Sequence, residues 1–285
     1  MTELLLEPFA YQFMRTALWC CALVGAVCGF LSAYLMLKGW SLIGDALSHS
    51  VVPGVAGAYA LGLPYSIGAF IAGFLAAGAM LFINQHSRLK QDAVIGLIFT
   101  GFFGAGLFMV SVSPTPIDVQ TIVFGNILAI APEDATQLLI ISLVAAVVLL
   151  LRWRELLVVF FDEAHARTVG LKPTQLKLIF FSLLSACAVT ALMTVGAFLV
   201  IALVVTPGAT AYLLCDRFSR LLVLSTVLGA TTSLVGVYLS YYLNGSTGGV
   251  IVVLQTTLFL LAFFFAPKHG VLTAQRRSRT ESVAT

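Results

Sequence analysis

The sequence contains very few charged residues. Aspartate, glutamate, lysine and arginine make up 9% of its 285 residues, whereas 60% are hydrophobic and the mean hydropathy is +1.04. Soluble domains usually carry about 25% charged residues, so this chain cannot build a surface that faces water on all sides. The composition excludes an ordinary soluble protein and predicts a protein that lies in lipid.

Several chemical signatures are also missing. The five cysteines (Cys20, Cys21, Cys28, Cys187 and Cys215) show no CxxC spacing, so we interpret them as packing residues rather than a metal or disulfide site. The chain has no GxxxxGK[ST] phosphate-binding loop, no nucleophile elbow and no HExxH zinc motif. These absences argue against ATP hydrolysis, acyl transfer and metalloproteolysis by this chain.

Long apolar runs fill most of the chain instead. A membrane-spanning helix needs roughly 20 apolar residues. Runs of about this length lie at 12–37, 41–62, 65–84, 92–112, 136–152, 177–195, 197–214, 221–243 and 249–266. The runs lack strict alternation, which favours helices over a closed barrel. We predict an all-α, polytopic transmembrane bundle of about eight or nine spans, with a half-helix or interfacial helix at 119–131.

Small residues are concentrated in one part of this bundle. Gly54, Gly57, Gly68, Gly73 and Gly78 recur at helical spacings. Small side chains let membrane helices approach one another closely. We therefore expect the spans in this region to be tightly packed.

Most lysine and arginine residues lie in alternate breaks between the runs. Basic residues lie at 88–90, 152–172 and 217–220 and in the tail 267–285, whereas the breaks at 62–64, 113–118, 131–135 and 243–248 contain none. The positive-inside rule puts the basic breaks and the C-terminus in the cytoplasm. We interpret the basic tail as an orientation signal rather than a nucleic-acid-binding patch.

One carboxylate and one imidazole lie together inside an apolar run. Asp45 and His49 are four residues apart, which puts both side chains on one helix face, one turn apart. Ionisable groups inside a bilayer are costly and are functional candidates by default. A mixed oxygen and nitrogen pair suits manganese, iron or zinc better than sodium or calcium. We interpret the pair as ligands on a metal transport path.

Pro53 follows this pair in the same run. Proline cannot donate a hydrogen bond to the carbonyl four residues earlier, which is that of His49, so we expect a kink and a free carbonyl. Broken helices recur at membrane transport sites. Two other interpretations of the pair stay open. Asp45 and His49 could relay protons, or they could be structural, with Asp45 bonded to His49 or to Lys38.

A polar segment separates the apolar runs between about residues 153 and 176. Asp162 can cap a short helix with Glu163 in its first turn, Gly170 can end this helix, and Pro173 prevents its renewal. A short helix on the cytoplasmic face can dock a partner protein, although a solvated connecting helix would show the same pattern. His165 is interpreted as a surface residue rather than a ligand.

Three separated motifs resemble one known family. Residues 44–54, with Gly-Asp-Ala-Leu-Ser-His and then Val-Pro-Gly, resemble the second-span signature of the manganese/zinc/iron permeases of ATP-binding-cassette (ABC) importers. Residues 161–170 resemble the cytoplasmic connection of these permeases, and residues 194–197 and 205–211 resemble their later Pro-Gly turn. The likeness covers nearly the whole chain and is nearest to chelated-iron and manganese uptake permeases of Gram-negative bacteria.

The resemblance implies a single transmembrane permease domain over residues 1–285, without enzymatic activity and without a permanently bound cofactor. Asp45 and His49 would lie on the path of a manganese, iron or zinc ion. The cytoplasmic segment would couple the permease to an ATPase through Asp162, Glu163, Ala164, Arg167 and Gly170.

The resemblance also implies partners and a location. The partners are cytoplasmic ATP-binding subunits, a second permease subunit of the same or a different kind, an extracytoplasmic metal-binding protein and membrane lipid. The location is the bacterial inner membrane. The alternative function is a self-contained, proton-coupled transporter of divalent metals, which would need no ATPase.

Overall fold

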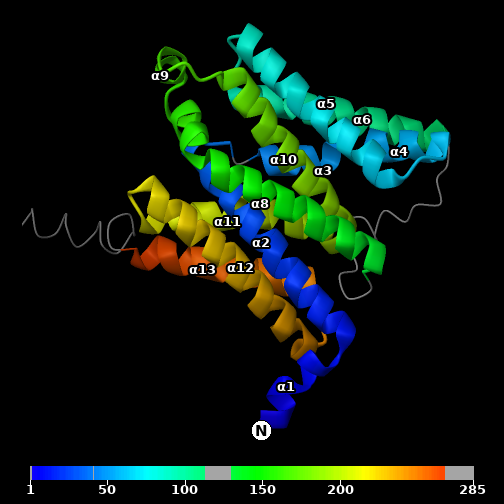
Figure 1. Cartoon of the computed structure of the whole chain (residues 1–285). Helices are drawn as coiled ribbons and strands as arrows, with labels where there is room; N and C mark the ends of the chain where they lie inside the picture. The colour runs from blue at the N-terminus through cyan, green and yellow to red at the C-terminus, as the bar shows by residue number, and fades with distance from the viewer. Residues whose placement is uncertain (1, 41, 113–129, 267–285) are drawn as a thin grey trace, which may run out of the picture. The chain divides into compact units, whose positions relative to one another are not determined.

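The regular structure of the described chain is entirely helical (Figure 1). The computed structural model describes residues 2–40, 42–112 and 130–266. The helices are α1 (Thr2–Ala10), α2 (Gln12–Lys38), α3 (Ile43–Ser50), α4 (Val52–Leu61), α5 (Tyr65–His86), α6 (Gln91–Val112), α8 (Pro132–Phe161), α9 (Glu163–Thr168), α10 (Pro173–Val195), α11 (Ala197–Leu214), α12 (Phe218–Leu243) and α13 (Thr247–Phe265). The predicted all-α class is confirmed. The tail 267–285 and nearly all of the predicted element 119–131 lie outside the described residues.

Within the described residues, seven helices are long and apolar enough to cross a membrane: α2, α5, α6, α8, α10, α12 and α13. The predicted run 41–62 is divided into the two short helices α3 and α4, and α11 contributes a shorter apolar stretch, Phe198–Leu214. A multi-pass membrane protein is confirmed, while the count of eight or nine spans stays a prediction.

The chain divides into two compact units. The first comprises Met1–Met36 and Ala202–Thr285, and the second comprises Leu37–Ile201. Every residue that the sequence singles out for the metal path or the ATPase contact lies in the second unit. The single permease domain over residues 1–285 stays a prediction.

In the first unit, α2 packs closely against α12 and α11. A Cβ atom on Gly25 would overlap the carbonyl of Gly229, and one on Gly229 would overlap the carbonyl of Gly25. Ser32 Oγ of α2 donates a hydrogen bond to the carbonyl of Val205 at 3.1 Å and accepts one from the Gly208 N–H at 3.0 Å. These bonds provide partners for the backbone of α11 on both sides of its internal proline.

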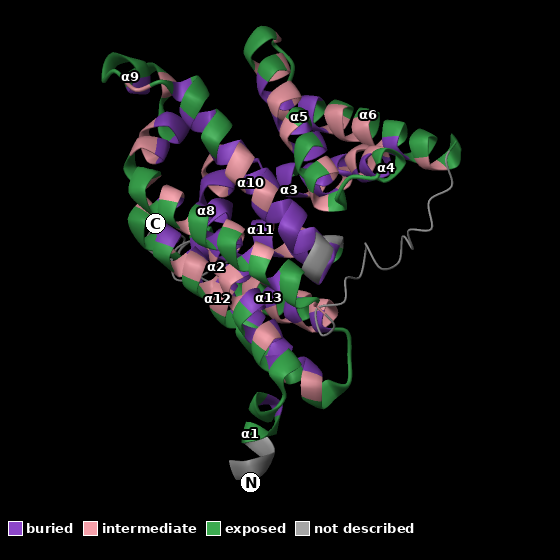
Figure 2. Ribbon diagram, turned by 45° about the vertical axis from the view of Figure 1, so that its right-hand side comes forward, coloured by how far each residue is buried: buried purple, intermediate pink, exposed green. Residues whose placement is uncertain are grey.

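In the second unit, the junction between α3 and α4 packs against α5 and α10. Val51, Val55, Ala69, Val189 and Leu192 form a buried apolar cluster at this junction. Figure 2 shows most of α3 in the colour of buried residues. The break in the run is therefore part of the core of this unit rather than a loose connection.

Glycines bring three helices of the second unit close to this break. Gly54 of α4 and Gly68 of α5 are so close that a Cβ atom on either would overlap the backbone of the other. Gly106 of α6 lies against Val52 and Pro53 at the start of α4. Gly54 and Gly68 thus have the close-packing role expected from the sequence, whereas a Cβ atom on Gly78 would meet no neighbouring element within 4 Å.

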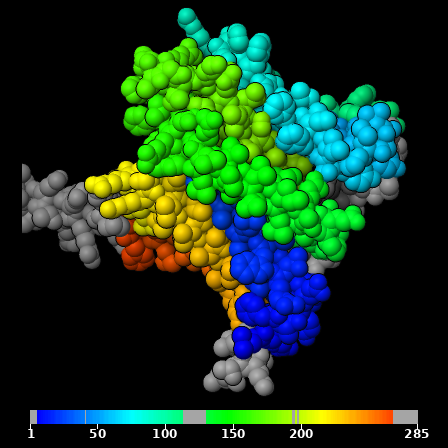
Figure 3. All heavy atoms as spheres, viewed as in Figure 1, coloured from blue at the N-terminus to red at the C-terminus, as the bar shows by residue number. Residues whose placement is uncertain are grey.

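The long helix α8 presents many apolar side chains at the surface, where Figure 3 shows it as a green band. The exposed large side chains on α8 include Leu139, Ile140, Leu143, Val144, Val147, Leu150 and Leu151. A continuous apolar surface on a helix of this length suits contact with lipid tails rather than water.

Candidate metal path and cytoplasmic helix

The short helix α3 holds Asp45 and His49 on its more open side. Its other side is buried through Ile43, Ala46 and Leu47, which fixes the rotation of the helix. His49 Nε2 lies 3.4 Å from Asp45 Oδ1, and the two side chains are 32% and 44% exposed, respectively. A single cation can therefore reach ligand atoms from both residues without unfolding the helix.

Two phenylalanines of α6 lie beside the His49 ring. The centroids of Phe99 and Phe103 are 5.6 and 5.5 Å from the centroid of the imidazole, at interplanar angles of 70° and 72°. The two phenyl rings are nearly parallel to each other, at 7°. This edge-to-face arrangement limits rotation of the imidazole. Sequence analysis did not identify these residues, although their spacing of four puts them on one face of α6.

The helix break lies next to the pair. α3 ends at Ser50 and α4 begins at Val52, with Pro53 as its second residue. One expectation needs correction, because the carbonyl of His49 is not free: the Val51 N–H donates a hydrogen bond to it. The turn at Val51 thus supplies a hydrogen-bond donor for the His49 carbonyl, which Pro53 cannot supply because it has no N–H. Proline is tolerated in the first turn of α4, where backbone N–H groups have no intrahelical acceptor.

Asp45 and His49 form a small ligand set. In residues 2–40, 42–112 and 130–266, no group of three or more His, Cys, Asp or Glu side chains is arranged to hold a metal ion. Structural zinc sites are usually closed by about four protein ligands. Two partly exposed ligands on one chain suit a passing ion, which must bind weakly enough to leave.

The predicted short helix is present as α9, a helix of six residues. Asp162 Oδ1 accepts hydrogen bonds from the N–H groups of Ala164 at 2.9 Å and His165 at 3.1 Å. Gly170 follows the helix with a φ of +81°, and its N–H donates to the carbonyl of Arg167 at 3.1 Å. The cap and the left-handed glycine hold a helix that would be too short to persist alone.

Glu163 ties α9 to α10. Its Oε1 accepts a hydrogen bond from Arg167 Nη2 at 2.9 Å, and its Oε2 pairs with the largely buried Lys177 of α10. Burial alone would raise the pKa of Glu163, but hydrogen bonds from Lys177 and Arg167, together with their positive charges, lower it below its ordinary value of 4.5. The carboxylate is therefore charged at neutral pH. Sequence analysis missed Lys177, whose position inside an apolar run was the available signal.

The outer side of α9 is open. Ala166 is buried against the helices beneath it, whereas Ala164 and Arg167 are exposed. Two apolar residues that flank the helix, Phe161 and Val169, are 76% and 62% exposed. Phe161 is the last residue of a candidate membrane span, and the other exposed side chains lie beyond it, where they can contact another protein.

Comparison with known proteins identifies the family. Residues 10–266 match the ABC 3 transport family. The chain is 64% identical over 279 residues to the chelated iron transport system membrane protein YfeC of Yersinia pestis, covering 98% of this chain and 95% of that protein. It is 48% identical over 276 residues to the manganese transport system membrane protein MntB of Synechocystis sp., covering 97% and 90%.

A solved structure is also similar. PsaBC from Streptococcus pneumoniae in complex with Fab matches with a TM-score of 0.83 and 34% sequence identity, over 96% of this chain and 100% of that chain. A second structure, titled an inward-facing conformation of a metal-chelate type ABC transporter, matches in fold with a TM-score of 0.65 at 18% identity, over 90% of this chain and 88% of that chain. This chain belongs to the ABC 3 transport family.

Proposed function

We propose that this chain is the membrane-spanning permease subunit of an ABC importer that moves divalent transition-metal ions across the bacterial inner membrane into the cytoplasm. Relatives named for chelated iron and manganese transport support iron and manganese as the cargo. Zinc has less direct support. The chain is a transport component rather than an enzyme, and a separate subunit hydrolyses ATP.

The Asp45–His49 pair is the observation that carries this function. An ion that enters a helical bundle loses part of its hydration shell and needs replacement ligands. The carboxylate supplies charge, and the imidazole nitrogen favours transition metals over calcium and magnesium. Their separation of 3.4 Å, on one face of α3, lets both groups contact the same ion.

Metal uptake by two variants tests the site. Asp45→Asn keeps the shape of the side chain but removes its charge, and His49→Phe keeps a ring but removes the nitrogen ligands. Each should abolish most uptake of radioactive manganese and iron by cells that carry the complete importer, while the permease still assembles. Asp92→Asn and His86→Phe, at exposed positions, are the controls. A near-parental rate in either test variant would remove that residue from the path.

ATP dependence separates the two functional hypotheses. Membership in an ABC family favours a permease that works with a partner ATPase over a self-contained, proton-coupled transporter. Proteoliposomes that contain the permease alone should take up no manganese under a proton gradient. Uptake should begin when ATP-binding subunits, ATP and the delivery protein are supplied. Proton-driven uptake by the permease alone would favour the alternative.

We further propose that α9 is the ATPase coupling element, because its outer side is exposed and its inner side is fixed to α10 through Glu163. Glu163→Arg breaks that attachment, and Ala164→Trp puts a bulky ring on the exposed face. Both variants should reduce co-purification of the ATPase while insertion into the membrane continues. Glu133→Arg, at the other end of α8, is the control. Normal co-purification and transport in both variants would place the docking surface elsewhere.

The proposed importer contains a second permease subunit and an extracytoplasmic metal-binding protein. Two different membrane proteins of Yersinia pestis, both named for chelated iron transport, are 64% and 39% identical to this chain. Their presence in one organism supports a pair of different permease chains, and a pair of identical chains is the other arrangement. Co-purification of two differently tagged copies of this chain distinguishes the two arrangements.

A further inference from the structure

Trp40 lies in the short link between α2 and α3 and is 3% exposed. Its ring stacks on the ring of Phe181 of α10, with centroids 5.4 Å apart. It contacts the ring of Phe160 of α8 edge to face, with a centroid distance of 5.6 Å and an interplanar angle of 64°. Phe180 contacts both of these phenylalanines, at centroid distances of 4.7 and 5.6 Å. We call Trp40, Phe160, Phe180 and Phe181 the Trp40 cluster. These rings join the start of α3 to the end of α8 and to the N-terminal half of α10.

One side of the Trp40 cluster is continuous with α9. Phe160 lies two residues before Asp162, which caps α9. Lys177, the partner of Glu163, lies three and four residues before Phe180 and Phe181, and therefore on the same face of α10. A displacement of α9 thus reaches the cluster both through the end of α8 and through the ion pair to α10.

The other side of the Trp40 cluster leads to the metal pair. The carbonyl of Trp40 accepts a hydrogen bond at 3.4 Å from the N–H of Ile43, the first residue of α3. Asp45 follows two residues later. Gly39, before Trp40, has a φ of +70°, a conformation that glycine adopts without a steric penalty. The chain can therefore turn sharply between α2 and Trp40, and a movement of Trp40 is passed directly to α3.

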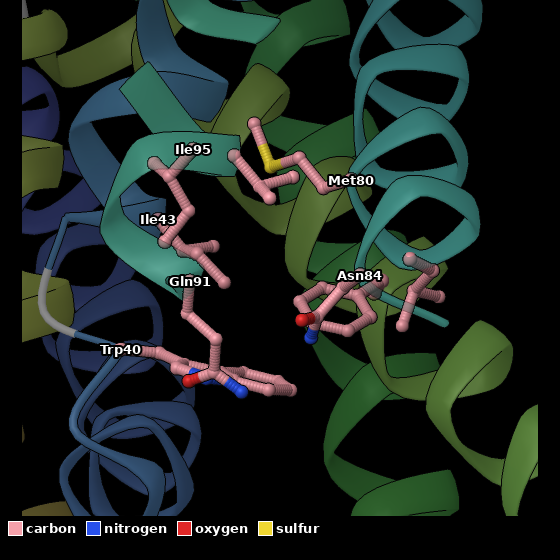
Figure 4. Close-up of a pocket in the computed structure, with 9 residues that line it drawn as sticks. Trp40, Ile43, Met80, Asn84, Gln91 and Ile95 are labelled. Atoms are coloured by element: carbon pink, nitrogen blue, oxygen red, sulfur yellow. The ribbon is translucent and has the colours of Figure 1, made fainter. Parts of the chain in front are cut away.

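A small pocket that is partly open to solvent lies beside the indole (Figure 4). Ile43, Met80 and Ile95 contribute apolar walls, and Gln91 and Asn84 contribute one amide each from α6 and α5. The Trp40 Nε1–H donates a hydrogen bond to Gln91 Oε1. Figure 4 shows the Asn84 side chain across the pocket from that of Gln91. The indole therefore has one hydrogen-bond acceptor in its present position and faces a second amide across a small pocket.

We propose that Trp40 is a positioning residue that transmits the movement of α9 to α3, and so to Asp45 and His49. Its N–H bonds to Gln91 in one state of the transport cycle and to Asn84 in the other. The two states differ in which amide accepts the bond and in how much of the pocket the indole fills. This inference rests on the proposed function, because it assigns the driving movement to ATPase subunits docked at α9.

The ratio of metal transported to ATP hydrolysed tests this role. The complete importer is reconstituted in proteoliposomes, and manganese uptake and ATP hydrolysis are measured in the same sample. Trp40→Phe keeps a ring in the cluster but removes the N–H, and Gln91→Leu removes its acceptor. Each should lower the ratio about threefold to tenfold, the range that loss of one hydrogen bond supports. The ratio in the double variant should be no lower than the ratio in the more impaired single variant, because both changes remove the same hydrogen bond.

Matched controls separate coupling from general damage. Trp19→Phe, at a position that is 71% exposed, and Gln85→Leu, at an exposed position, should keep the parental ratio. Gln91→Glu retains an acceptor oxygen and should also keep the parental ratio of metal transported to ATP hydrolysed. Asn84→Leu removes the second acceptor and should lower the ratio, with ATP hydrolysis retained.

Tryptophan fluorescence gives a second readout. The chain has three tryptophans, so Trp19→Phe combined with Trp153→Phe leaves Trp40 as the only one. Trapping the importer with ADP and vanadate should change the Trp40 emission, and adding Gln91→Leu should remove that change. If Trp40→Phe fails to assemble, the role of Trp40 is tested by the ratio of metal transported to ATP hydrolysed in Gln91→Leu and by the change in Trp40 fluorescence.

An unchanged ratio in Gln91→Leu, or the same fall in the controls, would overturn the role of Trp40. So would a Trp40 emission that does not respond to vanadate trapping. Failure of the proposed function would look different, because the parental importer would then show no ATP-dependent manganese uptake at all.

Discussion

At the scale of single residues, the candidate metal path depends on how loosely Asp45 and His49 hold each other. Good hydrogen bonds between nitrogen and oxygen are about 2.7–3.2 Å long. The 3.4 Å separation of His49 Nε2 and Asp45 Oδ1 is longer, so these two ligand atoms do not form a strong hydrogen bond with each other. An ion that binds here gives up part of its hydration without first having to break a tight pair.

Phe99 and Phe103 should matter because they hold the imidazole ring in place. An aromatic contact of this kind contributes about 0.5–1.5 kcal/mol. Phe99→Ala or Phe103→Ala should therefore lower manganese uptake about twofold to tenfold, measured as the initial rate in cells with the complete importer. Phe108→Ala, at a position on α6 that is 70% exposed, should leave the rate unchanged. Equal rates in all three variants would show that the ring of His49 needs no such support.

Glu163 gives the attachment of α9 a pH dependence. Because its pKa is lowered in the folded protein, the stabilisation is complete above the ordinary value of 4.5 and is lost as the pH falls through the lowered value. Hydrogen exchange of the α9 amides in purified permease should therefore speed up on acidification. Glu163→Gln should exchange fast at neutral pH already, and Glu155→Gln, which alters the exposed pair with Arg152, should behave like the parent. Slow exchange in Glu163→Gln would mean that the ion pair does not hold α9.

At the scale of helices, the break between α3 and α4 is held by neighbours that come very close to it. A Cβ atom on Gly106 of α6 would lie 2.7 Å from Val52 Cγ1 and 2.9 Å from the nitrogen of Pro53. The nitrogen belongs to the backbone and cannot rotate away. A side chain at Gly106 therefore has to push α4 and α6 apart.

Gly106→Ala should destabilise the permease by about 1–3 kcal/mol, the usual cost of overpacking. Thermal unfolding in detergent measures this as a lower midpoint. Gly104→Ala, two residues earlier on the same helix, adds a methyl group with no heavy atom within 4 Å and is the matched control. A midpoint for Gly106→Ala that equals that of the control would show that α4 and α6 separate at no cost.

At the scale of the whole molecule, the alternating basic breaks predict the sidedness of the protein in the membrane. Thr168 lies in a basic break, and Asn244 lies in the break between α12 and α13, which has no lysine or arginine. We therefore expect Thr168 to face the cytoplasm and Asn244 to face the opposite side.

Cysteine labelling tests this orientation. Four native cysteines are buried and Cys215 is partly exposed, so Cys215→Ser gives a suitable background. A membrane-impermeant maleimide should label Asn244→Cys but not Thr168→Cys in spheroplasts, and the reverse in inside-out vesicles. Labelling of Thr168→Cys in spheroplasts would show that the orientation is the reverse of the predicted one. A cytoplasmic ATPase could then not contact α9.

Much of the fold and part of the candidate site follow from short stretches of sequence. Long apolar runs predict helices because backbone groups in lipid must bond within their own segment. The spacing of four between Asp45 and His49 puts them on one helix face wherever that helix lies. Asp162 and Gly170 mark the ends of α9 because caps act on backbone groups only a few residues away.

Only the tertiary structure decided which distant residues meet. Trp40 and Gln91 are 51 residues apart in the chain, and Lys177 is 14 residues from Glu163, yet each pair forms a hydrogen bond. Pro53 already predicted a break in the run 41–62, but the hydrogen bond from the Val51 N–H to the His49 carbonyl was visible only in the structure. Periodicity describes one helix at a time, whereas these contacts depend on how several helices pack together.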